Sequence, residues 1–218
     1  MTGDASLSGY GEFLRHRTFL RYAPMGFVHY GGLIAIQSLW SGPWLVQVCG
    51  WTPNESSQGL FAINVSMLLS FMAGSSVVPH LYRHGWTAHS LIARGMPVSV
   101  GVLLLAVAFV VNSGAWVRAA FCVAGTVGAL SQPAIGQAFP AESAGRALTA
   151  YNLGVFGGVF SIQWGIGLAI DLFQSWGWAT LASFRGAFAI LAFSCALAFA
   201  WFVGFDDAIR LSRVRPAT

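Results

Sequence analysis

Residues 98–111 of the chain read VSVGVLLLAVAFVV, an apolar run without a single charged side chain. The run shows no alternation of apolar and polar positions, so it does not fit a strand of a membrane barrel. A segment inside a bilayer must satisfy its own backbone hydrogen bonds, and the α-helix is the remaining structure that does so. The run therefore predicts a membrane-spanning helix.

Similar apolar runs recur along the chain, each near the ~20 residues with which a helix crosses about 30 Å of hydrocarbon. Hydrophobic residues make up 56% of the 218 residues and charged residues only 8%. A water-soluble domain of this length has no core large enough for that much apolar surface. The sequence thus predicts an all-α membrane protein with six transmembrane helices, which cover 22–48, 60–78, 91–111, 116–139, 147–173 and 181–205.

The breaks between these runs are short and rich in helix-terminating residues. They contain Gly50, Pro53, Asn54, Pro79, Gly85, Asn112, Ser113, Gly114, Pro140, Gly145 and Gly177. Linkers of this length leave no room for a second soluble domain. We therefore expect one transmembrane domain, 22–205, between a cytoplasmic segment 1–21 and a cytoplasmic tail 206–218. The first residues are polar, so we expect no cleaved export signal.

Orientation follows from the basic residues, which are eleven arginines and no lysine. Positive charge in short loops stays on the cytoplasmic side. With both termini in the cytoplasm, that side holds Arg15, Arg17, Arg21, Arg83, Arg94, Arg146, Arg210, Arg213 and Arg215. Only Arg118 and Arg185 fall on the opposite side. The pattern predicts a multi-pass protein of the inner membrane, and the net charge of +4 reflects this orientation rather than a nucleic-acid partner.

Polar side chains are concentrated in the first, second, fourth and fifth expected helices, whereas the third and sixth carry little besides Ser99 and Ser194. An amide inside a bilayer is costly unless it faces protein or a water-filled cavity. Helical spacing also places Gln37, Trp40 and Trp44 on one face. These residues form either bonds between neighbouring helices or the lining of a solute pathway, in which indoles stack and amides hydrogen-bond.

Two segments resemble the second half of the major facilitator superfamily of transporters. The first is QSLWSGPWL at residues 37–45, and the second is PAESAGRA at residues 140–147; the likeness continues through Tyr151–Asn152–Leu153 to Gln163–Trp164 and Asp171. The resemblance implies a half-transporter fold whose first, second, fourth and fifth helices face a central cavity. The expected substrate-binding residues are Gln37, Trp40, Trp44, Asn64, Gln132, Asn152, Gln163 and Trp164.

The resemblance also suggests cytoplasmic gate residues. The family loop between the second and third helices carries a glycine, an aspartate, an arginine and a glycine. Arg83 and Gly85 fit this pattern, whereas Val78 and Tyr82 replace the glycine and the aspartate. Arg146, in a loop that resembles the corresponding one of the other half, is therefore the better gate candidate, with a positive anchor as its alternative.

The implied function is secondary active transport of a small solute by alternating access, without a cofactor. Partners would be membrane lipid, the solute and an N-terminal half or a second copy of the chain. His29 is the candidate for a coupling proton, although a bond to the backbone or a headgroup at the interface is the simpler role. We expect Asp171 to be a solvated residue at a helix end.

Two alternatives belong to other classes. An intramembrane serine protease would need a histidine base on a helix after Ser75 or Ser76, and none follows His89, so we expect no enzyme. A non-transporting six-helix scaffold or sensor, acting as a homo-oligomer, would fit the length of the chain. Substrate, direction of transport and coupling ion lie beyond the sequence.

Overall fold

The computed structural model describes residues 10–109 and 114–214, and the side chains of 11–109 and 114–205. Every regular element in these residues is a helix. Several expectations lie outside the described residues. They concern residues 1–9, the end of the third expected helix at 110–111, the loop residues Asn112 and Ser113, and the side chains of Arg210, Arg213 and Arg215.

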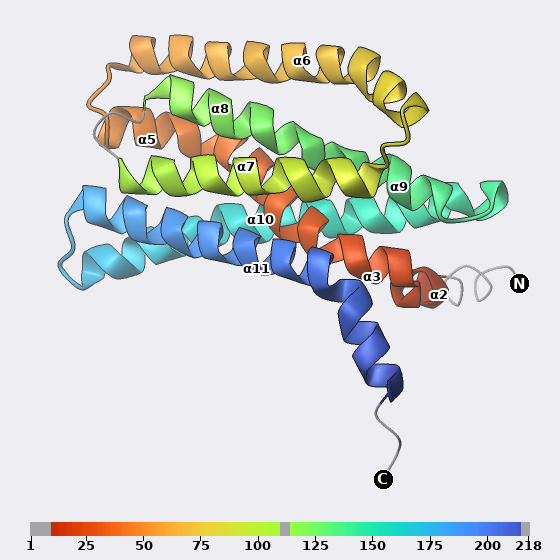
Figure 1. The fold of residues 1–218 in the computed structure, drawn as a ribbon. Helices are drawn as coiled ribbons and strands as arrows, with labels where there is room; N and C mark the ends of the chain where they lie inside the picture. The colour runs from red at the N-terminus through yellow and green to blue at the C-terminus, as the bar shows by residue number, and fades with distance from the viewer. Residues whose placement is uncertain (1–9, 110–113, 215–218) are drawn as a thin grey trace, which may run out of the picture.

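Five helical stretches are long and apolar enough to cross a membrane. They are α6 (Pro53–Arg83), α7 (Ala88–Ala108), the continuous stretch of α8 (Ala115–Gly125), the 3-10 helix η4 (Thr126–Leu130) and α9 (Ser131–Gln137), α10 (Ala141–Ser175) and α11 (Thr180–Val214, apolar to Phe205). These stretches lie side by side with alternating direction (Figure 1). The chain is thus an all-helical, multi-pass membrane protein by the length and composition of its helices.

The first expected helix, 22–48, is helical but is not one regular helix. It consists of α3 (Arg17–Pro24), the π-helix η1 (Met25–Tyr30), α4 (Gly31–Ala35), the π-helix η2 (Ile36–Trp40) and α5 (Ser41–Gln47). Each segment alone is too short to cross a membrane, so this stretch is not among the five spans. The segments follow one another obliquely through the bundle (Figure 1).

Two prolines account for much of this irregularity. A proline lacks the N–H that would bond the carbonyl four residues earlier, and π turns or neighbouring side chains then compensate. Pro24 precedes η1, and the Leu20 carbonyl that it leaves free accepts a hydrogen bond of 3.0 Å from Trp201 Nε1 on α11. Pro43 follows η2, where Ser41 Oγ donates to the Ile36 carbonyl at 2.8 Å. The sequence periodicity contained no signal for these breaks.

Three of the expected glycines lie in turns between helices as predicted, whereas Gly145 lies inside α10 and Asn54 in the first turn of α6. Gly50, Gly85 and Gly177 have φ of 70°, 82° and 85°, the left-handed region that favours glycine. Thr52 caps α6 in a capping box with Glu55. Pro79, however, does not end a helix, since α6 continues through it to Arg83.

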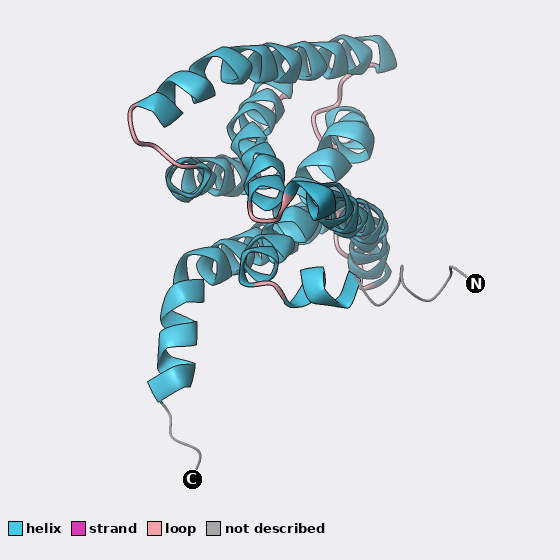
Figure 2. Ribbon diagram, turned by 90° about the vertical axis from the view of Figure 1, so that its right-hand side faces the viewer, coloured by secondary structure: helices cyan, strands magenta, loops and turns pink. Residues whose placement is uncertain are grey.

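Both ends of the chain are more helical than expected. Helix α2 (Tyr10–Arg15) and the start of α3 lie in the segment that we expected as a polar lead-in. Their side chains Phe13 and Phe19 are buried against the bundle. Helix α11 continues past residue 205 to Val214. Its last turns point away from the other helices, as the end-on view also shows (Figure 2).

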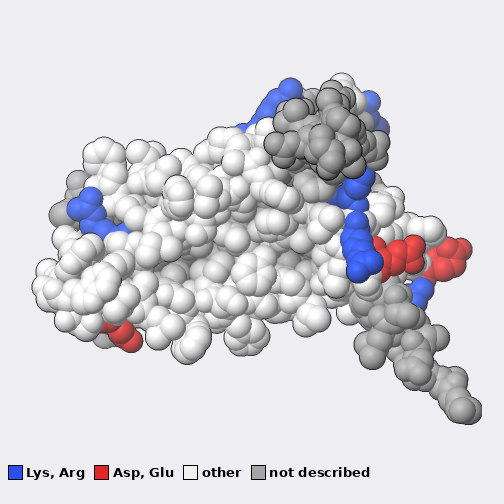
Figure 3. All heavy atoms as spheres, turned by 90° about the horizontal axis from the view of Figure 1, so that it is seen from below, with Lys and Arg blue, Asp and Glu red and all other residues white. Residues whose placement is uncertain are grey.

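The arginines separate to the two ends of the bundle, as Figure 3 shows for one face. At the end that holds α2, the α6–α7 turn and the start of α10 lie Arg15, Arg17, Arg21, Arg83, Arg94 and Arg146. At the opposite end, near the starts of α8 and α11, lie Arg118 and Arg185. Between the ends, the face in Figure 3 shows no charged side chain among the described residues.

The oblique stretch packs on α10 through glycine. A Cβ added to Gly158 would overlap the backbone carbonyl of Phe27 in η1, and one added to Gly31 would lie 2.9 Å from the Gly158 carbonyl carbon. Two backbones therefore touch without side chains between them. Gly154, one turn earlier, has no heavy atom within 4 Å of an added Cβ, so only one of these two glycines is needed for close approach.

This difference predicts opposite effects of two alanine substitutions. Gly158→Ala should lower the free energy of unfolding by about 1–3 kcal/mol, because overpacking forces α10 and η1 apart. Gly154→Ala should leave stability unchanged or raise it by up to about 1 kcal/mol, because alanine is the better helix former. Thermal unfolding of both variants in one detergent measures the difference, and equal melting temperatures would contradict the assigned contact.

Candidate functional site

A hydrogen-bonded polar group joins three elements at the middle of the bundle. Gln37 Nε2 in η2 donates to Asn64 Oδ1 on α6. On the other side of η2, Ser38 Oγ accepts from Gln163 Nε2 on α10 at 3.0 Å. The structure therefore brings together amides from the first, second and fifth expected helices, and the central member lies in a π-helix. Such π segments within α-helices are common at functional sites.

A pocket of about 400 Å³ opens beside this group, between η2 and α10. Trp40 forms its floor, with Nε1 donating to the Gln163 carbonyl oxygen at 3.0 Å. A Cβ added to Gly167 would lie 3.4 Å from the Trp40 ring, so a larger residue there would press on the indole. The remaining lining residues are Leu39, Phe160, Gln163, Trp164, Leu168 and Asp171. The side chain of Trp164 is 73% exposed at the edge of the pocket.

Asp171 lies in this pocket, although we expected only a solvated carboxylate at a helix end. It follows Trp164 by seven residues, a spacing that places both on one face of α10. This spacing in the sequence indicated that Asp171 shares a face with Trp164. The position of Asp171 near the end of the apolar run suggested only a solvated residue. The pocket thus offers two indole faces, an amide and one carboxylate, which suit a small amphipathic or singly cationic solute.

Trp44 lies in the interior and not on this surface. Its side chain is 0% exposed, and its ring meets Phe184 and Phe188 at centroid distances of 6.0 and 5.1 Å. The guanidinium of Arg118 lies 3.9 Å from the Trp44 ring centroid. In this structure Trp44 therefore supports the bundle beneath η2 and does not line the pocket.

Arg118 itself is buried and stacked between two aromatic rings. It is 1% exposed, and its guanidinium carbon also lies 5.3 Å from the Phe188 ring centroid. Its Nε and Nη2 atoms have no hydrogen-bond partner among the described residues. In this setting the guanidinium is stabilised chiefly by cation–π interactions with the two rings. The distribution of arginines predicted Arg118 only on the side opposite most of the others, near the start of the fourth expected helix, and did not predict its burial.

Gln132 and Asn152 belong to a second polar level, nearer the end that holds α2. Asn152 precedes Gln163 by eleven residues, roughly 16 Å along α10. Among the described residues, neither side chain forms a hydrogen bond with the Gln37 group. Their sequence neighbours join α9 to α10 instead, since Tyr151 Oη donates to Ser131 Oγ at 2.6 Å. The eight expected binding residues thus divide between two levels and the core.

The two gate candidates lie at the end rich in arginine. Arg83 is the last residue of α6 and is exposed. Arg146 is exposed near the start of α10, with its guanidinium 5.7 Å from the ring centroid of Phe13 on α2. The segment before the first span therefore lies against the better gate candidate, which the sequence did not indicate.

His29 is not an interfacial residue. It is 0% exposed in η1, and its Nε2 lies 3.0 Å from Ser99 Oγ on α7. Its Nδ1 has no partner among the described residues. Ser99, the polar residue that stood out in the third expected helix, thus has an internal bond to this histidine. No group of three histidine, cysteine or acidic side chains in the described part of the chain could hold a metal ion.

The Trp44–Arg118 stack predicts a measurable coupling. Trp44→Leu should destabilise the chain strongly, because it leaves a buried cation without its ring face and also opens a cavity. In an Arg118→Met background the same change should cost about 1–2 kcal/mol less, which is the share of the cation–π contact. Melting temperatures of the two single variants and the double variant in detergent give this coupling, and strict additivity would argue against the stack.

Comparisons of the chain with protein-family models, with curated proteins and with solved structures give no match. The resemblance to major facilitator transporters therefore remains a prediction from the quoted segments.

Proposed function

We propose that the chain is one half of a secondary active transporter of the major facilitator type. It moves a small solute across the inner membrane by alternating access, as a half-unit that pairs with an N-terminal half or a second copy of itself. The observation that carries this proposal is the pocket formed by Trp40, Gln163, Trp164 and Asp171 on the face where η2 meets α10. A π segment within a helix, as in η2 beside this pocket, is common at functional sites.

The oblique stretch then supplies a sixth crossing. Residues 17–47 are helical without interruption, which is roughly 45 Å at 1.5 Å per residue. That length exceeds the hydrocarbon thickness of about 30 Å. The arginine-rich end faces the cytoplasm under the positive-inside rule, and it is the end where α2 and the end of α11 lie. Both termini are then cytoplasmic.

The exposed stripe on α10 supports a partner subunit or half. Leu153, Phe156, Phe160 and Trp164 are 74%, 58%, 72% and 73% exposed, and they follow one another at helical spacing. The polar Gln37–Asn64 pair, which joins η2 to α6, is also exposed. A surface that mixes amides with large aromatics favours contact with protein around a solute path over contact with lipid alone. A homo-oligomeric scaffold would cover the same stripe, so a measurement of transport is needed to distinguish the scaffold from the transporter.

Cysteine labelling tests the six crossings. In a chain whose Cys49, Cys122 and Cys195 are replaced by serine or alanine, single cysteines are introduced as Glu12→Cys, Asn54→Cys, His84→Cys and Gln174→Cys. All four positions are exposed. A membrane-impermeant maleimide on intact cells should label positions 54 and 174 and leave 12 and 84 unlabelled until the cells are opened. Labelling of 12 together with 54 would show that residues 17–47 do not cross.

Solute flux tests the pocket. Vesicles that contain the chain with its partner half are screened with aromatic and aliphatic amines and with neutral amphipathic solutes. Trp164→Ala and Gln163→Leu should each lower uptake about ten-fold or more, which corresponds to about 1.4 kcal/mol of lost binding or more. Trp176→Ala, which removes a similarly exposed indole outside the pocket, is the matched control. Uptake that is absent across the whole panel, or unchanged in both pocket variants, would favour the scaffold.

A further inference from the structure

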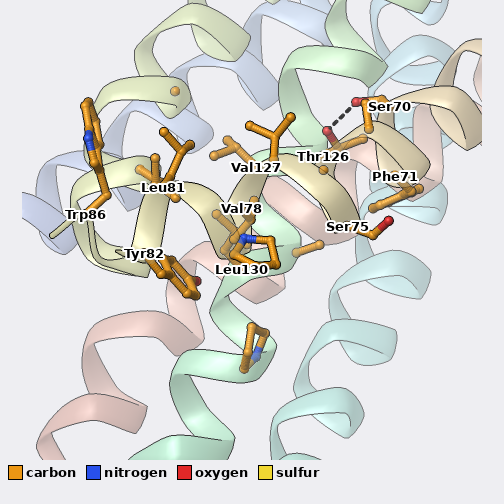
Figure 4. A pocket seen from close by; sticks show the side chains of 18 of the residues that line it. Ser70, Phe71, Ser75, Val78, Leu81, Tyr82, Trp86, Thr126, Val127 and Leu130 are labelled. Atoms are coloured by element: carbon orange, nitrogen blue, oxygen red, sulfur yellow. Dashed lines mark hydrogen bonds between the residues drawn. The ribbon is translucent and has the colours of Figure 1, made fainter. Parts of the chain in front are cut away.

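A second and larger cleft lies apart from the solute pocket, between the last turns of α6 and the stretch α7 to α9. Its volume is about 850 Å³. Figure 4 shows side chains from α6 on one wall, Val127 and Leu130 of η4 on the other, and Trp86 at one end. Helix α6 is at the edge of the bundle in both ribbon views. The cleft is therefore bounded on one side by a peripheral helix.

The walls of the cleft are almost wholly apolar. Phe71, Val78 and Leu81 face Val127 and Leu130 across it. The polar side chains at its inner end satisfy each other, since Ser70 Oγ and Thr126 Oγ1 lie 2.9 Å apart (Figure 4). Nothing along the walls requires a polar ligand group, so the space favours a hydrocarbon chain.

The outer end of the cleft has the opposite character. Arg94 lines it, with its guanidinium 4.3 Å from the ring centroid of Trp86. Tyr82 adds a second amphipathic ring at the same level. Indole and phenol rings are enriched where hydrocarbon meets headgroups. No carboxylate is present among the described lining residues, so the cation at the mouth favours an anion.

We propose that this cleft is a binding site for an anionic phospholipid, with one acyl chain between α6 and α8–η4 and the phosphate at Arg94. Charge complementarity sets the headgroup, because a cation at the end of an apolar cleft fits a phosphate attached to a hydrocarbon chain. The arginine-rich end places this headgroup in the same leaflet as the other basic side chains. The lipid fills the space under the peripheral helix and ties α6 to the bundle.

A glycine in the wall of the cleft allows its apolar space to be filled by substitution. Gly74 lines the cleft, and a Cβ added there has no heavy atom within 4 Å. Gly74→Leu therefore places a side chain in the acyl space without a backbone clash. Gly101→Leu, on α7 and equally free of neighbours within 4 Å, is the control for a leucine added elsewhere. Leucine favours helix over glycine, so neither variant should unfold.

The experiment is native mass spectrometry of the full chain in detergent, titrated with phosphatidylglycerol or with phosphatidylcholine of identical chains. The natural chain should retain one phosphatidylglycerol about five-fold more tightly than phosphatidylcholine, the effect of one arginine near the surface. Arg94→Gln should abolish that preference, and Gly74→Leu should weaken both lipids. Arg15→Gln, an exposed arginine at the same end, and Gly101→Leu should behave as the natural chain.

Two results would overturn the proposal. One is equal retention of the two lipids by the natural chain, which would remove the role of Arg94. The other is unchanged phosphatidylglycerol binding in Gly74→Leu, which would place the lipid elsewhere. Displacement by inorganic phosphate at matched concentration would also count against it, because the apolar cleft would then contribute nothing. Melting curves of every variant without added lipid ensure that lost binding does not reflect unfolding.

Discussion

The backbone contact between Gly158 of α10 and Phe27 of η1 is the constraint around which the rest of the bundle is arranged. It is possible only because neither Gly158 nor Gly31 carries a side chain. The oblique stretch must therefore follow the surface of α10 closely, and its regular hydrogen bonding gives way to π turns on both sides of α4. Those turns in turn direct Gln37 toward α6 and Trp40 toward α10. The pocket is a consequence of this contact.

Buried polar groups in the bundle are handled in two ways. The amides, the hydroxyls and His29 mostly bond to one another, as His29 and Ser99 do, or to a backbone carbonyl, as Ser41 does with Ile36. Arg118 is different, since its cation is held over aromatic rings with two donor nitrogens unpaired among the described residues. Stacking of this kind stabilises a cation where water is absent and no acid is near. Among the residues that the structure describes, this interior cation has no ion pair.

Much of the architecture could be predicted from the composition and from the helix-terminating residues between the apolar runs. Apolar runs of spanning length predicted five of the helices, although α6 and α10 begin six or seven residues earlier than expected, and Gly50, Gly85 and Gly177 marked turns that the structure confirms. The division of arginines between the two ends also matched. Spacing alone could not reveal the π segments, because they arise from proline and from a contact with a helix more than a hundred residues away in sequence.

The candidate site was harder to predict. An expected stripe is drawn on a regular helix of 3.6 residues per turn, and two π turns shift the phase of everything after them. Trp44 was therefore expected on the same face as Gln37, but in the structure it lies in the core. Gln163 and Asn64 could be singled out because amides are costly inside a bilayer, and Trp40 because of its spacing from Gln37. Asp171 is exposed near the end of α10, as expected, but its place in the pocket was not predicted.

The π-helix η1 also has a consequence for sequence register. A π turn accommodates one residue more than an α turn, so η1 can be regarded as an α-helix that has absorbed an insertion. Deletion of one residue within Met25–Tyr30, with a return to regular α winding, would therefore leave the residues on both sides facing the same neighbours, whereas a deletion in a regular α-helix rotates one side by about 100° relative to the other. Pro24 and the Gly31 contact hold both sides in place. The wider turn thus gives this short segment a tolerance of one residue in length that a regular helix at the same contact would lack.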